Sequence, residues 1–203
     1  MIEEVTGVLL AGGQSRRMGQ DKRFLTLGGV TLFDRVRGVL EALFSEVLIV
    51  LAEEAPDLHT GKGKVVYDVI PGCAAAGGLY TGLFYSMHPR IFAVACDMPL
   101  LQSELISHMS SISPLADIVT VKLGDDFQPM HSFYSKACAG YLETMLRSGT
   151  YKIQNLFDHE HLSVHVVPAQ DFQPYDPGNI SFLNVNTPGD LERAQHIMAS
   201  SES

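Results

Sequence analysis

Apolar residues in the first half of the chain form two kinds of segment that follow one another in turn. Short continuous apolar runs, typical of buried strands, occupy residues 5–11, 46–52, 64–67 and 91–96. Segments that favour helices occupy residues 32–44, 78–87 and 103–112, and Ser103 is expected to cap the last of them. Strands that alternate with helices predict a mostly parallel sheet with helices on both faces.

The second half of the chain is more mixed. Strands are expected at residues 117–121, 130–134 and 162–167, and a helix is expected over residues 136–147. Thr187-Pro188-Gly189-Asp190 is typical of a helix start, with threonine as the N-cap and an acidic residue near the positive helix end. The whole pattern predicts one α/β domain with a three-layer α/β/α, Rossmann-like sheet that binds ligands at the carboxyl ends of its strands.

Composition and charge narrow the classes of function. The chain has 203 residues, of which 46% are hydrophobic, and a formal net charge of −9. This length suits one well-buried domain, and the acidity argues against binding to nucleic acids or anionic membranes, which needs basic surfaces. The three cysteines form no CxxC pair, and no apolar run approaches the length of a membrane span. We therefore expect a protein of the reducing cytoplasm.

The most informative segment is a glycine-rich loop directly after the first predicted strand. It reads LLAGGQSRRMGQDK over residues 9–22 and contains Gly12, Gly13, Ser15, Arg16, Arg17, Gly19 and Lys22. Glycines let backbone N–H groups curl around a polyanion, and nearby cations neutralise its charge. The spacing matches neither a Walker A loop nor GxGxxG, and glycines alone would favour an ordinary turn. The cations beside them favour phosphate binding.

Two aspartates follow later predicted strands and should face the same edge of the sheet. Asp97 ends the apolar strand in AVACDMPL, and Asp68 closes the strand in KVVYD. Asp97 could cap the next turn, but beside a phosphate loop we favour a Mg²⁺ ligand, because Mg²⁺ prefers one or two carboxylates with phosphate oxygens. The small residues that follow Asp68 are equally compatible with two interpretations. Asp68 could contact a planar ligand, or it could lie in a flexible loop.

Two asparagines near the C-terminus form another polar group. Asn184 and Asn186 alternate in LNVNTP, so both should face the same side of an extended segment. Their amides could bind a heterocycle, a phosphate or metal-bound water, and turn chemistry before a helix is the alternative.

Histidines and cysteines point to no further catalytic group. His159, His161 and His165 lack the usual zinc spacing, and we interpret them as solvated surface residues. His131 and Cys96 lie in predicted strands, and we interpret both as packed core side chains.

Taken together, these strings resemble the molybdenum cofactor guanylyltransferase (MobA) family over nearly the whole chain. The most specific match is L-A-G-G-x-S-x-R-M-G-x-D-K, from Leu10 to Lys22. CDMP at 96–99, QP at 128–129 and NVNTP at 184–188 follow in the family's order. The first motif alone indicates a nucleotidyltransferase of the nucleotide-diphospho-sugar type, and the double glycine with NVNTP indicates this member of the superfamily.

The resemblance implies Mg²⁺-dependent transfer of GMP from GTP to molybdopterin, or to its molybdenum-loaded form, with release of pyrophosphate. It implies a single nucleotidyltransferase domain over residues 1–203, with a nucleotide-binding half (1–100) and an acceptor-binding half (101–203). The implied nucleotide contacts are Leu10, Ala11, Gly12, Gly13, Ser15, Arg17, Gly19, Lys22, Asp68 and Asp97. Arg17, Lys22 and Asp97 would be catalytic, and Asp97 would bind Mg²⁺. Asn184 and Asn186 would serve the acceptor side or the metal, and other proteins of cofactor biosynthesis or delivery would be partners.

The sequence departs from the family pattern at two places. Ala74-Ala75-Ala76 stands where the family usually has Gly-Pro-Leu in a loop that helps to form the base pocket. Leu51-Ala52 stands where the family often has an asparagine. The alternatives are a molybdopterin cytidylyltransferase, or a nucleotidyltransferase for a sugar or lactyl phosphate. Gly12 favours GTP, because the cytidylyltransferases tend to have alanine there. A non-catalytic nucleotide-binding module is disfavoured by the metal carboxylate of Asp97.

Overall fold

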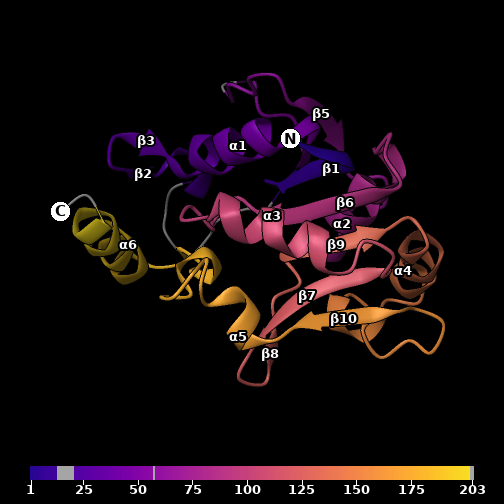
Figure 1. Cartoon of the computed structure of the whole chain (residues 1–203). Helices are drawn as coiled ribbons and strands as arrows, with labels where there is room; N and C mark the ends of the chain where they lie inside the picture. The colour runs from indigo at the N-terminus through magenta and orange to yellow at the C-terminus, as the bar shows by residue number, and fades with distance from the viewer. Residues whose placement is uncertain (13–20, 57, 202–203) are drawn as a thin grey trace.

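Strands and helices alternate along the first half of the chain, as the hydrophobic pattern predicts (Figure 1). The structure is a computed structural model and describes residues 1–12, 21–56 and 58–201. The strands of its main sheet are β1 (Ile2–Leu10), β4 (Phe44–Leu51), β5 (Lys64–Tyr67), β6 (Arg90–Ala95), β7 (Ile118–Leu123), β8 (Asp126–Phe127), β9 (His131–Ser135) and β10 (Val164–Val167). The α-helices are α1 (Leu32–Leu43), α2 (Ala74–Tyr85), α3 (Ser103–Ile112), α4 (Cys138–Arg147), α5 (Ala169–Phe172) and α6 (Pro188–Ser201).

The main sheet has the strand order β10-β7-β9-β6-β1-β4-β5, and β8 pairs with β7. β1 is parallel to β4 and β6, β4 is parallel to β5, and β10 is parallel to β7. β9 is antiparallel to both of its neighbours. The expected α/β fold with a mostly parallel sheet is therefore confirmed. Because β1, β4, β5 and β6 run in one direction, their carboxyl ends meet at one edge, where open α/β sheets bind ligands.

Side chains of the central strands alternate between two hydrophobic cores, one on each face of the sheet. Leu9 of β1 packs in the core that contains residues of α1, α3 and α5. Its neighbour Val8 packs in the core that contains residues of α2 and α4. Both side chains are fully buried, and burying such a side chain contributes about 1.5–3 kcal/mol relative to leaving it exposed. This burial holds the carboxyl end of β1 rigidly in place.

A third hydrophobic cluster joins the C-terminal helix to the N-terminal half. Leu27, in the small hairpin of β2 (Thr26–Leu27) and β3 (Val30–Thr31), packs in it with Val185 and with Ala194 of α6. Figure 1 shows α6 (yellow) on the same side of the molecule as this hairpin. The cluster therefore brings the NVNTP segment close to the residues that follow the glycine-rich loop.

The predicted strand and helix boundaries agree with the structure to within three residues, with one exception. The exception is α2, which begins at Ala74 and not at 78, because its start consists of alanine and glycine and is buried from Ala76 onwards. Such a segment has no polar face and therefore no helical pattern to read. Ser103 is not the cap of α3, since Gln102 holds that position and makes no side-chain cap bond.

Several short elements were not predicted because they are too short to have a recognisable period. These are the β2–β3 hairpin, β8, α5, and the 3₁₀ turns η1 (Lys22–Phe24), η2 (Ile153–Leu156) and η3 (Ile180–Phe182). Two of them adjoin predicted site residues, since η1 carries Lys22 and η3 leads into the NVNTP segment. Among the described helices, none is both long and apolar enough to cross a membrane.

Candidate active site

A cavity of about 550 Å³ lies at the carboxyl ends of the parallel strands. Its wall comes from the ends of β1, β4 and β6, from the residues that follow them, from the start of α2 and from η1. Four charged side chains line it: Lys22, Arg23, Asp68 and Asp97. Cavities of this size accommodate small-molecule ligands, and this one lies where the sheet topology predicts a ligand site.

Asp97 follows β6 directly and is held at both its backbone and its side chain. Its carbonyl oxygen accepts a hydrogen bond of 2.8 Å from the amide of Val185. Its Oδ2 lies 3.4 Å from the Lys22 ammonium, whereas its Oδ1 is buried with no hydrogen-bond partner in the described part of the chain. Burial raises the pKa of the Asp97 carboxyl above its ordinary value, and the charge of Lys22 opposes that rise.

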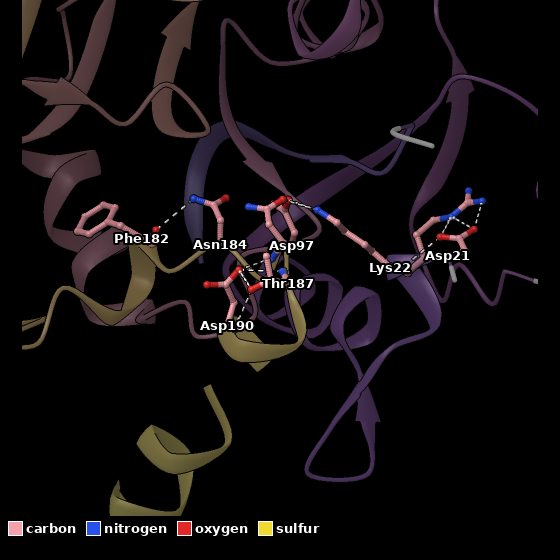
Figure 2. A network of polar contacts seen from close by, with 9 residues as sticks. Asp21, Lys22, Asp97, Phe182, Asn184, Thr187 and Asp190 are labelled. Atoms are coloured by element: carbon pink, nitrogen blue, oxygen red, sulfur yellow. Dashed lines mark hydrogen bonds and ion pairs between the residues drawn. The ribbon is translucent and has the colours of Figure 1, made fainter. Parts of the chain in front are cut away.

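Lys22 connects Asp97 to the C-terminal segment (Figure 2). It begins η1, which Asp21 caps by accepting a 3.0 Å hydrogen bond from the amide of Arg23. Its ammonium also donates to Oδ1 of Asn186. The Lys22 side chain is only 17% exposed, so its charge is held within the site by this pair of oxygen acceptors.

The NVNTP segment contributes its two asparagines differently. Val185 is buried between Asn184, which is exposed, and Asn186, which is partly buried. Asn186 reaches Lys22, whereas the side-chain amide of Asn184 donates to the carbonyl of Phe182 at 3.3 Å. Asn186 is thus brought into the polar group at Asp97. The role of both asparagines on the acceptor side stays a prediction.

Asp68 follows β5 and lies on the other side of the cavity. Its amide donates to the carbonyl of Leu51, which extends the parallel pairing by one residue. Its Oδ1 is buried and finds no partner within the described ranges, and burial raises the pKa of the carboxyl. Nearby, Thr81 of α2 accepts from the amide of Val69 at 3.0 Å and donates to the carbonyl of Gly77 at 2.8 Å. A side-chain hydrogen bond with Thr81 opposes the rise in the pKa of Asp68, and Oδ1 is the acceptor atom that has no partner in the described part of the chain.

The part of the glycine-rich loop that the structure describes ends at Gly12. Leu10 and Gly12 line the cavity, whereas Ala11 is buried and its amide donates to Val50. A Cβ at Gly12 would lie 2.8 Å from the backbone nitrogen of Ala52, so this position requires glycine. The predicted contacts Gly13, Ser15, Arg17 and Gly19 lie outside the described residues.

Several residues of the cavity wall were missed in the sequence analysis. Arg23 lines the cavity and is paired with Asp21, and its place directly after Lys22 was a usable signal. Cys96 was interpreted as a core residue, but it lies at the cavity wall while also packing against the core. Burial and the charge of Asp97 raise the pKa of its thiol to about 12, which favours the protonated form.

The start of α2 lines the cavity with two alanines in unequal conformations. Ala74 has a φ of +50°, a left-handed conformation that suits glycine, whereas Ala75 has no such value. Ala74 occupies the first position of the stretch where the resembled family usually has Gly-Pro-Leu. The backbone here thus keeps a turn for which glycine is suited, and alanine bears the strain.

The described side chains fit a divalent cation best at Asp97. No cluster of three or more His, Cys, Asp or Glu side chains occurs among the described residues. Mg²⁺, however, is commonly held by one or two carboxylates together with phosphate oxygens of the substrate. The buried, unpartnered Oδ1 of Asp97 is a hard oxygen donor of this kind.

No described histidine lines this cavity, but the interpretation of His159 and His165 as solvated surface residues is wrong. Both are partly buried, and Nε2 of His165 is buried with no hydrogen-bond partner in the described part of the chain. His131 is fully buried between the rings of Phe92 and Phe182. His161 is exposed, and His159 packs on Tyr141 at a ring distance of 4.1 Å.

Comparison with known proteins agrees with this geometry. The family described as the MobA-like NTP transferase domain matches residues 7–165. The chain is 34% identical over 200 residues to the "Probable molybdenum cofactor guanylyltransferase" of Pelotomaculum thermopropionicum, covering 98% of this chain and 96% of that one. It is 30% identical over 196 residues to the "Molybdenum cofactor guanylyltransferase" of Desulfosudis oleivorans, covering 96% of each chain.

A solved structure is also similar in fold. The crystal structure of molybdopterin-guanine dinucleotide biosynthesis protein A from Archaeoglobus fulgidus has a TM-score of 0.84 and 27% sequence identity. The match covers 96% of this chain and 99% of that one. The similarity therefore extends over the cavity and over the C-terminal segment that reaches it.

Proposed function

Because the chain belongs to the family of MobA-like NTP transferase domains, which are nucleotidyltransferases, we propose that it transfers GMP from GTP to molybdopterin or its molybdenum-loaded form. Pyrophosphate would be the second product. The observation that carries the proposal is the pairing of Lys22 with Asp97 at the cavity, which sets a cation suited to phosphate beside a carboxylate suited to a metal ion.

The reaction requires positioning and charge neutralisation more than a covalent intermediate on the protein. A phosphate oxygen of the pterin attacks the α-phosphorus of GTP, and the bond from that phosphorus to the pyrophosphate oxygen breaks. Lys22 would bind an oxygen of the triphosphate and neutralise charge that develops on the leaving pyrophosphate. Arg17, which lies outside the described residues, is the predicted second cation for the same group.

Asp97 would hold Mg²⁺ through its free Oδ1, and the bound ion would neutralise charge on the phosphate oxygens. Lys22 lies on the other carboxylate oxygen of Asp97, so the two positive charges would approach the triphosphate from neighbouring positions. The backbone of Asp97 is fixed by Val185, which keeps this carboxylate in place as the substrate binds.

Asp68 is our proposed contact to the base. Guanine carries two N–H groups side by side, N1–H and N2–H, which one carboxylate can accept together. Cytosine offers only one such donor group at its pairing edge. The free Oδ1 of Asp68 and the small residues Gly72, Ala74 and Ala75 beside it suit a planar base.

The proposal also covers the second substrate, the cellular location and the protein partners. Asn184 and Asn186 would contact the pterin substrate, since Asn186 bonds Lys22 beside Asp97 while neither asparagine lines the cavity that contains Asp68. We propose a cytoplasmic location, which the free cysteines support, and contact with other proteins of cofactor biosynthesis or delivery, which would supply or receive the pterin.

A nucleotide-by-acceptor assay tests the proposal. We expect pyrophosphate release from GTP only when Mg²⁺ and molybdopterin are both present. Asp97→Asn should lower the rate by about 10²-fold or more, by analogy with the loss of one preorganised electrostatic group. Asp125→Asn is the matched control, because that carboxylate is fully exposed on a turn, and it should retain the wild-type rate.

Four results would contradict the proposal in different ways. Pyrophosphate release with CTP and not GTP would assign a cytidylyltransferase. Release with a sugar or lactyl phosphate, and none with molybdopterin, would assign a different acceptor. Binding of GTP without turnover under any condition would assign a non-catalytic nucleotide-binding module, and an unimpaired Asp97→Asn variant would refute the metal role of Asp97.

A further inference from the structure

The segment before α6 is tied to the helix by one carboxylate. Oδ2 of Asp190 accepts three hydrogen bonds, from the amide of Asn186 at 3.0 Å, the amide of Thr187 at 2.8 Å and the hydroxyl of Thr187 at 2.9 Å. The hydroxyl of Thr187 in turn lies 3.2 Å from the amide of Asp190, as in a capping box. Figure 2 shows Asp190 below Thr187 in this network.

The other end of the same segment is attached to the proposed catalytic pair. The amide of Val185 donates to the carbonyl of Asp97, and the side chain of Asn186 accepts from Lys22. Val185 is fully buried in one hydrophobic cluster with Leu27, and this packing holds the segment in place. Three successive residues, 185–187, therefore connect Asp190 on one side with Lys22 and Asp97 on the other.

We infer that Asp190 is a positioning residue for the transfer reaction, acting through Asn186 on Lys22 and through Val185 on Asp97. Asp190 does not line the cavity, so it would not touch the nucleotide. Its hydrogen bonds fix the backbone of Asn186, and the side chain of Asn186 fixes where the Lys22 ammonium lies. The expected effect of Asp190 on catalysis rests on the proposed function. The expected effect of Asp190 on the order of residues 185–187 does not.

The physical reason is that a charged side chain helps the transition state only when it is already in place. Without Asp190, the amides of Asn186 and Thr187 lose their acceptor and the segment gains freedom. Lys22 would keep its charge and still attract GTP, but its average position would shift. Misplacement by about 1 Å can cost up to about 10²-fold in rate, so we expect kcat to fall more than KM changes.

The test compares Asp190→Ala, Asp190→Asn and Asp190→Glu with the control Glu192→Ala. Glu192 is an exposed acidic residue two positions further along α6, so its removal changes the charge equally and leaves the hydrogen bonds of residues 185–187 intact. For each variant we would measure kcat, KM for GTP, the midpoint of thermal unfolding, and hydrogen exchange of the amides of residues 183–187 without substrate.

We expect Asp190→Ala to lower kcat by about 10-fold or more with KM for GTP within about 2-fold, and to speed exchange of the Val185 amide, which Asp190 does not bind. Asp190→Asn should lower kcat less than Asp190→Ala does and should unfold at a higher temperature than Asp190→Ala. Asp190→Glu should recover activity, because glutamate is the usual residue of a capping box at this position. Glu192→Ala should behave as wild type.

Two results would overturn the inference. One is unchanged exchange of the Val185 amide in a folded Asp190→Ala or Asp190→Asn protein. The other is an unchanged kcat in those variants while the wild type is active. If the wild type itself transfers no GMP, the proposed function fails, and the exchange measurement still decides whether Asp190 holds this segment.

Discussion

His131 lies on β9 with its ring wholly removed from solvent, between the edges of Phe92 and Phe182 at centroid distances of 5.1 and 4.8 Å. Neither ring nitrogen has a hydrogen-bond partner in the part of the chain that the structure describes. Burial lowers the pKa of His131 from its ordinary value of 6.5 to about 4. The imidazole is therefore neutral in the folded protein at every pH well above 4.

The sign of the effect on stability follows from proton uptake. As the pH falls below 6.5, the unfolded chain binds a proton at His131 while the folded protein does not, so the free energy of unfolding decreases. The loss is complete near pH 4, where the folded protein also takes up the proton. With the two pKa values of 6.5 and about 4, the expected loss between pH 7 and pH 5 is about 2 kcal/mol.

The perturbation is His131→Leu, which replaces the ring by an apolar side chain of similar size. Urea unfolding at pH 7 and pH 5 would be followed by circular dichroism, since the chain has no tryptophan to report by fluorescence. Relative to the wild type, the free energy of unfolding of the variant should rise by about 2 kcal/mol when the pH is lowered from 7 to 5. Leu115→Ala, at an exposed site with no titratable group, is the control and should change with pH as the wild type does. An equal pH dependence in wild type and His131→Leu would refute the reasoning.

Three further changes test Gly12 and Ala74 of the cavity wall, and Thr81 of α2. Gly12→Ala should destabilise the protein by about 1–3 kcal/mol and weaken GTP binding, because the new Cβ meets the backbone of Ala52; an unchanged unfolding midpoint and unchanged GTP binding in calorimetry would contradict this. Ala74→Gly should raise the free energy of unfolding by up to about 1 kcal/mol, since it relieves a left-handed alanine. Its control, Ala75→Gly, should lower that free energy by about 0.5–1 kcal/mol, and equal effects of the two in urea unfolding would contradict the strain. Thr81→Val should cost about 1–3 kcal/mol in thermal unfolding because the amide of Val69 loses its acceptor, and a cost near zero would show that this hydrogen bond is replaceable.

The sheet and the two aspartates could be predicted because they depend on local patterns. A buried strand is visible as an apolar run, and a polar residue at its end must lie at the carboxyl edge of a parallel sheet. This reasoning located Asp68 and Asp97 at one edge from the sequence, and both line the same cavity in the structure.

The contacts between distant segments could not be predicted in this way. Asn186 lies 164 positions after Lys22, and their meeting depends on the packing of α6 and Val185 against the β2–β3 hairpin. No residue pattern near either end specifies that packing. The start of α2 was missed for a related reason, since Ala74 and Ala75 carry no apolar period, and the left-handed conformation of Ala74 is unexpected for alanine.

We propose that the Lys22–Asp97 cavity catalyses transfer of GMP, which is the α-phosphoryl group with its nucleoside, from GTP to molybdopterin. The most direct measurement follows GTP labelled with radioactive phosphorus at the α or the γ position, with molybdopterin and Mg²⁺ present. We expect the α label to appear in a pterin dinucleotide and the γ label in pyrophosphate. An α label that remains with GTP, or that leaves as free GMP with no pterin product, would contradict it.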